Sequence, residues 1–381
     1  MIVKQLHRML SQYPVVSLTG PRQSGKTTLL KHVLKDYQYC NLEDHVLREY
    51  ANADPKGFLS QYEGKLIIDE AQYAPKLFSY IQLNVDESKL FGQYVLSGSQ
   101  NFLLAQSITQ SLAGRVAVME LLPLSIAELR AEGVLPPLYD LLIKGCYPGL
   151  YDNKIDIFPW YRNYIKTYVE RDVRSLMNIK DLSVFAKFLK LCALRNGQVI
   201  NYHTMASDLQ VSSPTVKHWI SILEASYLVF QLPSYTKSIG KRVIKSSKLY
   251  FYDPGLVASL IGVTEQGQLM NMDIKGSLYE SLMVSEFYKY TYNHLAPISL
   301  SYWRYRDKHE IDLIVSHFSD ILAIEFKSGA TIKESFFNHF DYFASHHEGN
   351  ISNYVMYGGN SRQNRTVANV IPWYEELLDF H

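Results

Sequence analysis

The segment that decides the fold reads Gly20-Pro21-Arg22-Gln23-Ser24-Gly25-Lys26-Thr27, and Thr28-Leu29-Leu30 follow it. It matches G-x-x-x-x-G-K-[ST], the pattern of a phosphate-binding loop. The apolar run 15–19 before the loop predicts a buried strand, and the residues after it predict a helix, which is the context that the motif requires. Backbone N–H groups of such a loop and the helix N-terminus favour a bound phosphate. We therefore predict a nucleoside triphosphate site at residues 20–28.

A second motif follows the loop at the expected place. Residues 65–70 form an apolar run that ends in Asp69 and Glu70. If this chain is a phosphate-loop ATPase, Lys26 would contact the β- and γ-phosphates, and Thr27 and Asp69 would bind Mg²⁺. Glu70 would then activate the attacking water. The paired carboxylates favour an ATPase over a small-molecule kinase. The guanine-reading motif Asn-Lys-x-Asp is absent, which favours ATP over GTP.

Polar side chains also end the next apolar run, 94–96. Ser97 or Ser99 is a candidate to lie between the acidic residue and the γ-phosphate, and ordinary turn chemistry is the alternative. Arg115 follows a helix predicted from residue 102. It is a candidate arginine finger, acting in cis or from a neighbouring subunit, and a surface salt bridge is the alternative.

Composition bounds the class of protein. The chain has 381 residues, 47% of them hydrophobic and 20% charged, as in globular proteins of two or three domains. Its three cysteines, Cys40, Cys146 and Cys192, are far apart and form no CxxC pair, which argues against a zinc ribbon or a disulfide framework. Neither a signal peptide nor an eighteen-residue apolar run is visible, so we expect a cytoplasmic protein without a membrane span.

Breaks in the chain predict three domains. Ser125 and Glu128 form a capping box for a helix that runs to Gly133, and proline-rich breaks follow at 136–137 and 147–149. The first boundary is therefore expected between residues 133 and 156. We assign an ATPase domain to 1–150, a helical domain to 151–245 and a third domain to 246–381.

Charge differs between these three parts. Residues 1–150 carry 14 Lys/Arg and 14 Asp/Glu, residues 151–245 carry 14 and 7, and residues 246–381 carry 10 and 16. The middle part is thus the candidate surface for an anionic partner such as DNA, and docking on the acidic third part is the alternative.

The middle part has the outline of a winged helix. A helix near 204–209, a turn, a helix from Ser213 and a strand at 227–232 follow one another. Such a second helix can read DNA, but here it offers few cations, so a protein-docking module is the alternative. A basic run comes next, with Lys237, Lys241, Arg242, Lys245 and Lys248. This run could be the wing, an interdomain contact to ATP phosphates or a solvated loop.

Acidic residues recur on two apolar runs of the third part. Asp312 lies on the run 310–315, and Glu325 and Lys327 share one face of the run 321–327, because strand side chains alternate. With Glu280 from a preceding helix, these carboxylates could hold Mg²⁺ while Lys327 positions water for phosphodiester attack. A solvated hairpin with an ion pair is the alternative.

Taken together, the chain resembles a bacterial and archaeal family of AAA+-type ATPases whose C-terminal half is a domain of unknown function with a nuclease-like end. The resemblance covers nearly the whole chain. It rests on residues 20–29, Ile67 to Gln72, Leu96 to Ser99, Gly114-Arg115, Tyr168 to Asp172, Leu249 to Leu256, Glu310 to Asp312 and Glu325 to Lys327.

The resemblance implies the fold class α/β, with an αβα P-loop ATPase core on a parallel sheet, a winged helix, and a PD-(D/E)xK domain similar to restriction endonucleases and Holliday junction resolvases. It implies an ATP site at Lys26, Thr27, Asp69 and Glu70, and a nuclease-like site at Glu280, Asp312, Glu325 and Lys327. Ile311 departs from the proline that many such nucleases have. A shared fold does not establish shared chemistry.

Two hypotheses of different class follow. In the first, ATP and Mg²⁺ bind the first domain, and the nucleotide state controls a DNA-associated, nucleolytic C-terminal domain. In the second, the protein is a nucleotide-operated switch or scaffold whose winged helix and degenerate nuclease fold bind a protein partner. A homo-oligomer is compatible with both, and a small-molecule kinase is the least favoured reading.

Overall fold

The computed structural model describes residues 2–99, 111–152, 155–174, 179, 181–235, 247–305, 308–347 and 349–377, with the backbone alone at 170–172. The helix expected from residue 102 lies outside these residues. The chain forms two compact units. The first unit comprises Met1–Pro123, Ala225–Tyr227 and Tyr292–Leu295, and the second comprises Leu124–Glu224, Leu228–Thr291 and Ala296–His381.

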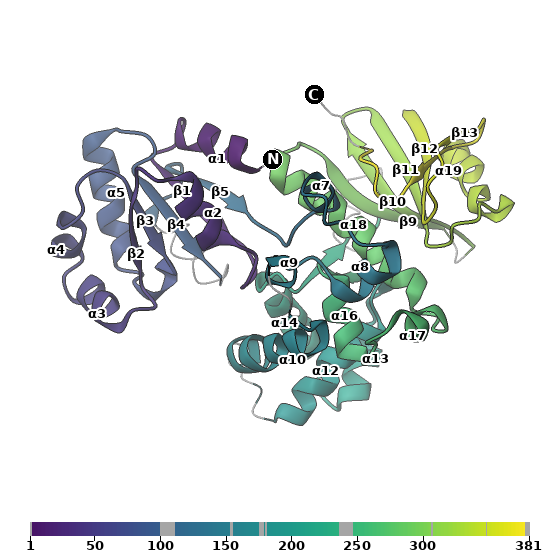
Figure 1. Cartoon of the computed structure of the whole chain (residues 1–381), viewed down its shortest axis with the longest axis horizontal. Helices are drawn as coiled ribbons and strands as arrows, with labels where there is room; N and C mark the ends of the chain where they lie inside the picture. Colours follow the sequence, from purple (N-terminus) through teal and green to yellow (C-terminus); the bar gives the residue numbers. More distant parts are fainter. Residues whose placement is uncertain are drawn as a thin grey trace. The chain divides into compact units, whose positions relative to one another are not determined.

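A five-stranded parallel sheet with the order β2-β3-β4-β1-β5 organises the first unit (Figure 1). This confirms the expected α/β class with a parallel sheet. Its strands are β1 (Val15–Thr19), β2 (Gln38–Asn41), β3 (Leu66–Asp69), β4 (Tyr94–Gly98) and β5 (Val116–Glu120). Its helices are α1 (Ile2–Leu10), α2 (Lys26–Val33), α3 (His45–Ala53), α4 (Pro55–Ser60), η1 (Ala71–Tyr73) and α5 (Leu77–Ser88).

Apolar residues on both sides of the strands create three layers. Side chains alternate along a strand, so Val15 and Leu96 pack on one face while Val16 and Val95 pack on the other. The first face is covered by α3, α4 and α5, and the second by α1 and α2. A parallel sheet needs this cover on both faces. It also brings the carboxyl ends of β1, β3 and β4 to one edge.

A three-stranded antiparallel sheet of order β6-β8-β7 lies within the second unit, together with its helices. The strands are β6 (Gln198–Val199), β7 (Val229–Leu232) and β8 (Lys248–Phe251). The helices are α7 (Ile126–Ala131), α8 (Leu138–Lys144), α9 (Gly149–Asp152), α10 (Ile157–Tyr164), a π-helix (Ile165–Val173), α12 (Leu182–Leu194), α13 (Tyr202–Leu209), α14 (Ser213–Ala225), α16 (Pro254–Ile261), α17 (Gln266–Met270) and α18 (Lys275–His294).

The second unit ends in a six-stranded sheet of order β13-β14-β12-β11-β10-β9. Strands β9, β10 and β11 are antiparallel neighbours, whereas β11, β12 and β14 run parallel. The elements are β9 (Ser299–Tyr305), β10 (His309–His317), β11 (Asp320–Lys327), η3 (Glu334–Phe337), α19 (Phe340–His346), β12 (Asn350–Tyr357), β13 (Gln363–Asn364) and β14 (Asn369–Pro372). Phe340 and Phe343 of α19 are buried in the core of this sheet.

The division into units differs from the three domains expected from the sequence. The first unit ends at Pro123 rather than near residue 150, because the segment before α7 is bound to α18. Buried Lys289 donates to the Leu124 carbonyl at 2.9 Å, and Glu286 accepts from Ile126 N at 2.7 Å. The expected boundary at 245 also falls inside a unit, because β8 pairs with both β6 and β7.

Two local predictions are confirmed in the second unit. The capping box is confirmed, since Ser125 N–H and Glu128 N–H each bond to the other residue's side chain. The helix expected from Ser213 is α14, and it buries Val216, Trp219, Ile220 and Leu223. In the part of the chain that the structure describes, no helix is long and apolar enough to cross a membrane.

Candidate functional site

The phosphate loop follows β1 at the carboxyl edge of the first sheet. Gly20 has φ 150°, and a Cβ there would lie 2.1 Å from the Leu121 carbonyl oxygen, so only glycine fits. Gly25, with φ 93°, precedes α2 and offers no side-chain cap, which leaves the first N–H groups of this helix for a ligand. Gln23 is left-handed, with φ 67°. The loop therefore has the backbone form that a phosphate needs.

Lys26 closes this loop. Its side chain is buried, and its Nζ donates to the carbonyls of Gly20 at 2.9 Å and Pro21 at 2.8 Å. Burial lowers the pKa of Lys26 to about 8, although Glu70 and Asp69 oppose this shift. Nearby, the Ser24 hydroxyl is buried and has no hydrogen-bond partner among the described residues. An ammonium group that donates to two carbonyls, and a hydroxyl without a partner in the described part of the chain, fit an anionic ligand.

Asp69 is the centre of the strand-end cluster. It is buried at the end of β3, where Oδ2 accepts from Thr27 Oγ1 at 2.7 Å and from the Tyr39 hydroxyl at 2.9 Å. Oδ1 accepts from Ser97 Oγ and, at 3.1 Å, from Glu70 N. Thr27 and Asp69 thus lie side by side, as a Mg²⁺ shared with nucleotide phosphates requires. Tyr39 was not predicted, because its position depends on β2 pairing with β3.

Glu70 follows directly in an uncommon conformation. Its φ of 52° is left-handed, and its Oε2 accepts from Gln72 Nε2 and, at 3.3 Å, from Ser99 Oγ. The two serines named from the sequence therefore contact different acids: Ser97 donates to Asp69, and Ser99 donates to Glu70. Gln72 is a contact that the sequence did not single out.

The remaining loop residues have lesser parts. Arg22 is half-buried, and its charge contributes to lowering the pKa of Lys26. Thr28 is exposed on the first turn of α2. All the residues expected at the ATP site thus lie at one edge of the sheet, except Arg115.

Arg115 lies at the opposite edge of the sheet. Its carbonyl accepts from Val15 N, at the amino end of β1, while the phosphate loop follows the carboxyl end. Five strand residues, about 16 Å, separate the two edges. Its guanidinium binds Asp86 of α5, with Nε–Oδ1 at 2.5 Å and Nη2–Oδ2 at 2.8 Å. Because of this sheet polarity, the prediction that Arg115 is an arginine finger in cis is wrong. The structure contains the alternative, a surface salt bridge.

A second cluster of charged side chains lies in the second unit. Leu313 pairs with Ile324, which sets Asp312 of β10 opposite Glu325 of β11. Lys327 binds both acids, Asp312 at 3.4 Å and Glu325 at closer range, and Asp312 also accepts from Phe326 N at 2.8 Å. The predicted arrangement of Asp312, Glu325 and Lys327 on neighbouring strands is therefore present.

Lys248 of β8 completes this cluster. Its Nζ lies 2.8 Å from Glu280 Oε1 of α18 and 2.5 Å from Glu310 Oε1 of β10, and the Tyr250 hydroxyl donates to Glu280 as well. Lys248 is only 3% exposed, so for this member of the basic run the alternative of a solvated loop is wrong. Long-range strand pairing places it there, so the local sequence gave no sign of it.

The charges of this cluster are strongly perturbed. Burial raises the pKa of Glu280 and of Glu325, whereas the ammonium groups of Lys327 and Lys248 outweigh burial at Asp312 and lower its pKa. Glu325 Oε1 is buried and has no hydrogen-bond partner among the residues that the structure describes. Within the described ranges, no group of three or more His, Cys, Asp or Glu side chains is placed to hold a metal ion. In this arrangement, Lys248 and Lys327 neutralise these acids.

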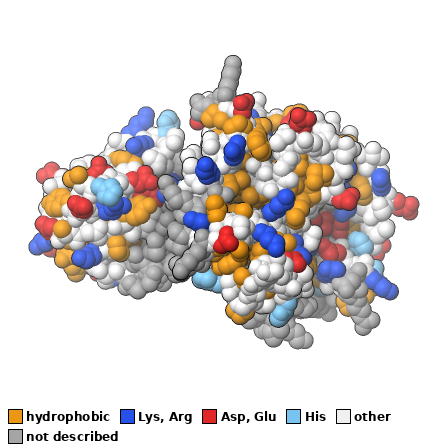
Figure 2. Space-filling model, turned by 90° about the horizontal axis from the view of Figure 1, so that it is seen from below, with side chains coloured by type: hydrophobic (Ala, Val, Ile, Leu, Met, Phe, Trp, Pro, Cys, Tyr) orange, Lys and Arg blue, Asp and Glu red, His pale blue; other side chains and the backbone are white. Residues whose placement is uncertain are grey.

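Other candidate surfaces are less complete. The basic residues Lys237, Lys241, Arg242 and Lys245 lie outside the described residues. The exposed face of α14 carries Lys217 and His218. On the face drawn in Figure 2, Lys and Arg side chains are scattered among hydrophobic and polar groups.

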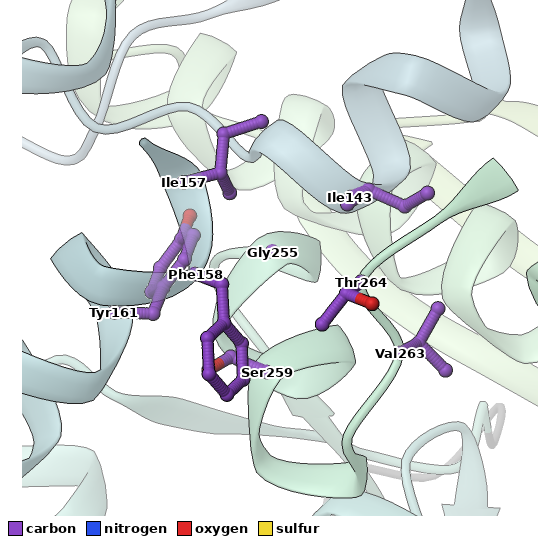
Figure 3. A pocket seen from close by; sticks show the side chains of 8 residues that line it. All are labelled: Ile143, Ile157, Phe158, Tyr161, Gly255, Ser259, Val263 and Thr264. Atoms are coloured by element: carbon purple, nitrogen blue, oxygen red, sulfur yellow. The ribbon is translucent and has the colours of Figure 1, made fainter. Parts of the chain in front are cut away.

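A small pocket lies between α10 and α16 (Figure 3). Phe158 and Tyr161 of α10 line it with Gly255 and Ser259 of α16, and its volume is about 20 Å³. A space of this size holds about one water molecule. It is therefore no site for a nucleotide.

Comparison with known protein families identifies the type of the N-terminal domain and gives no function for the rest of the chain. An AAA domain matches residues 12–130, and two domains of unknown function, DUF8612 and DUF4143, match residues 136–267 and 275–375. The Walker-type ATPase PABY2304 of Pyrococcus abyssi is similar in structure, with a TM-score of 0.46 and 15% identity over 68% of this chain and 94% of that one.

Two curated relatives are similar over most of the chain. The uncharacterized protein MJ1637 of Methanocaldococcus jannaschii is 23% identical over 76% of this chain and 70% of its own. The uncharacterized protein Rv2008c of Mycobacterium tuberculosis is 30% identical over 86% of this chain and 73% of its own. The chain therefore belongs to the same family as Rv2008c, and its N-terminal part is an AAA domain of the ATPase type.

Proposed function

We propose that this protein binds and hydrolyses ATP in its first unit and that the nucleotide state controls the second unit. One observation carries the ATPase assignment: at one sheet edge, Thr27 and Asp69 are in contact beside the phosphate loop, and Glu70 follows Asp69. Kinases of small molecules need no second carboxylate here, whereas hydrolysis needs a group that accepts a proton from water.

The geometry of the site supports a role for each of its residues. Lys26 exchanges its two carbonyl partners for phosphate oxygens, and the N–H groups of α2 and its loop surround the phosphates. Bound Mg²⁺ would supply charge neutralisation, with Thr27 and Asp69 as its protein contacts. Glu70 accepts the proton of the attacking water, and Ser97 and Ser99 orient the two acids.

A route for control begins next to the phosphate loop. Within the first unit, the Tyr227 hydroxyl shares a 2.7 Å hydrogen bond with Thr19 Oγ1 and donates to Glu120 Oε1 at 2.9 Å. Thr19 immediately precedes Gly20, and Tyr227 follows α14 by two residues. A change in the loop on nucleotide binding would therefore reach the segment that joins α14 to β7.

For the second unit, we propose a winged helix and a nuclease-like sheet. The succession α12-β6-α13-α14-β7-β8 with the strand order β6-β8-β7 supports the first. The mixed sheet with α18 before it and α19 between β11 and β12 supports the second. DNA is the partner that we propose for these parts.

A specific observation favours a second candidate function. Lys248 lies among the carboxylates where a nuclease would bind its metal, so this cluster can serve as a structural ion-pair network. In that case, the second unit is a degenerate nuclease fold that binds a protein partner, and the protein is a nucleotide-operated switch.

Hydrolysis of ATP in the presence and absence of linear and branched DNA tests these proposals, with cutting of the DNA scored in the same tube. We expect hydrolysis to be abolished by Lys26→Ala, and Glu70→Gln to bind ATP without turning it over. Glu63→Gln, an exposed change of the same type, is the matched control.

The outcomes separate the candidates. DNA-stimulated hydrolysis, with cutting that disappears in Asp312→Ala, supports the nuclease. Hydrolysis that ignores DNA, with DNA left intact, supports the switch. Normal turnover by Glu70→Gln would contradict the general-base role. An Arg115→Ala variant that turns over normally at every protein concentration would exclude a role in trans.

A further inference from the structure

Gln72 is a buried side chain that the roles above do not use. It belongs to η1, directly after the acidic end of β3, and it is 6% exposed. Its Nε2 donates to Glu70 Oε2, the same oxygen that accepts from Ser99 Oγ. Two donors from different elements thus converge on one oxygen and orient the whole carboxylate.

The other half of the Gln72 amide shows why an amide is needed. Its Oε1 is buried and has no hydrogen-bond partner among the described residues. Burying an unpaired amide oxygen is unfavourable, so an apolar side chain would fill this space better. Turning the amide over would set its oxygen against the carboxylate, so the assignment of donor and acceptor is determined by the contact. The Nε2 group that donates to Glu70 is therefore what glutamine provides here and an apolar side chain of the same size would not.

The backbone of Glu70 leads to the same conclusion. A left-handed φ of 52° is unfavourable for a residue with a side chain, and such conformations persist where surrounding contacts hold them. Gln72 and Ser99 each hold the Glu70 carboxylate by a side-chain hydrogen bond.

We infer that Gln72 is a positioning residue for ATP hydrolysis, because it holds Glu70 in the orientation in which it accepts a proton. This inference rests on the proposed function. In the step concerned, the oxygen of water bonds to the γ-phosphorus and the bond from that phosphorus to the leaving diphosphate oxygen breaks. The water proton passes to Glu70.

The test compares Gln72→Met, which keeps the shape and removes the donor, with wild type. We expect kcat to fall roughly 10- to 100-fold, as for a misplaced catalytic group, while the Kd for ATP changes less than twofold and the melting temperature does not fall. Gln38→Met is the matched control, because Gln38 is exposed and its side-chain amide donates to the backbone carbonyl of Glu63, away from Glu70. In a Glu70→Gln background, Gln72→Met should have no further effect on residual turnover.

Unchanged kcat in Gln72→Met, or an equal loss in both backgrounds, would overturn the inference. A second readout does not depend on hydrolysis: the side-chain amide resonance of Gln72, identified by its absence in Gln72→Met, should move in Glu70→Ala. A resonance that does not move would overturn the inference even if the protein hydrolyses ATP. If the resonance moves in Glu70→Ala but the wild-type protein does not hydrolyse ATP, the contact is present and the proposed function has failed.

Discussion

Lys26 makes nucleotide binding sensitive to pH. Because its pKa in the nucleotide-free protein is lowered to about 8, it loses its charge above that pH, and phosphate binding restores the charge. Binding therefore takes up a proton above pH 8. We expect affinity for ATP to fall about 20-fold from pH 7.5 to pH 9.5. Isothermal titration calorimetry in buffers of different ionisation enthalpy measures both the affinity and the proton. Equal affinity at the two pH values would contradict the role of burial.

Lys248 gives a second prediction for a single residue. Lys248→Met leaves Glu280 and Glu310 without their buried counter-charge, and removal of one partner of a buried ion pair costs about 3–5 kcal/mol of stability. Lys65→Met is the control, because Lys65 and Asp36 form an exposed pair whose loss costs about 1 kcal/mol or less. Urea unfolding measures both. If Mg²⁺ restores stability to Lys248→Met but not to wild type, the carboxylates can take a metal once the lysine is gone.

At the scale of elements, the turn between α14 and β7 is held by Tyr227. Tyr227→Phe keeps the ring but removes the hydrogen bonds to Thr19 and to Glu120, a carboxyl group whose pKa is raised by burial. A hydrogen bond to a charged group contributes about 1.5–3 kcal/mol, so we expect a loss of this size in urea unfolding. Tyr37→Phe, which removes a bond to the Gly92 carbonyl, should lose about 1 kcal/mol. Similar losses in both variants would argue against a special contact at Glu120.

For the whole molecule, strand pairing decides which pieces can fold alone. Residues 151–245 lack β8, the central strand between β6 and β7, and should be unfolded in isolation. Residues 124–381 keep all three strands and the six-stranded sheet, and should fold. Dispersion of amide resonances distinguishes the two. A well-dispersed spectrum for 151–245 would show that its helices suffice without the sheet.

Much of the first unit could be predicted because its signals are local. The apolar run before Gly20, the glycines of the loop and the carboxylates that end β3 each follow from neighbouring residues. Parallel strands meet at one edge, so Asp69 and Ser97 could be expected together before their contact was known. The capping box of Ser125 was predicted for the same reason.

The sequence by itself determined the α/β class, the phosphate-loop motif and the acids on β10 and β11, because these depend on short patterns and on side-chain alternation. Only the tertiary structure decided the burial of Lys248 among those acids, the placement of Arg115 away from the phosphate loop and the contact of Gln72 with Glu70. These features depend on which strands become neighbours and how side chains then pack. Such pairing joins residues distant in the chain, and no local pattern encodes it.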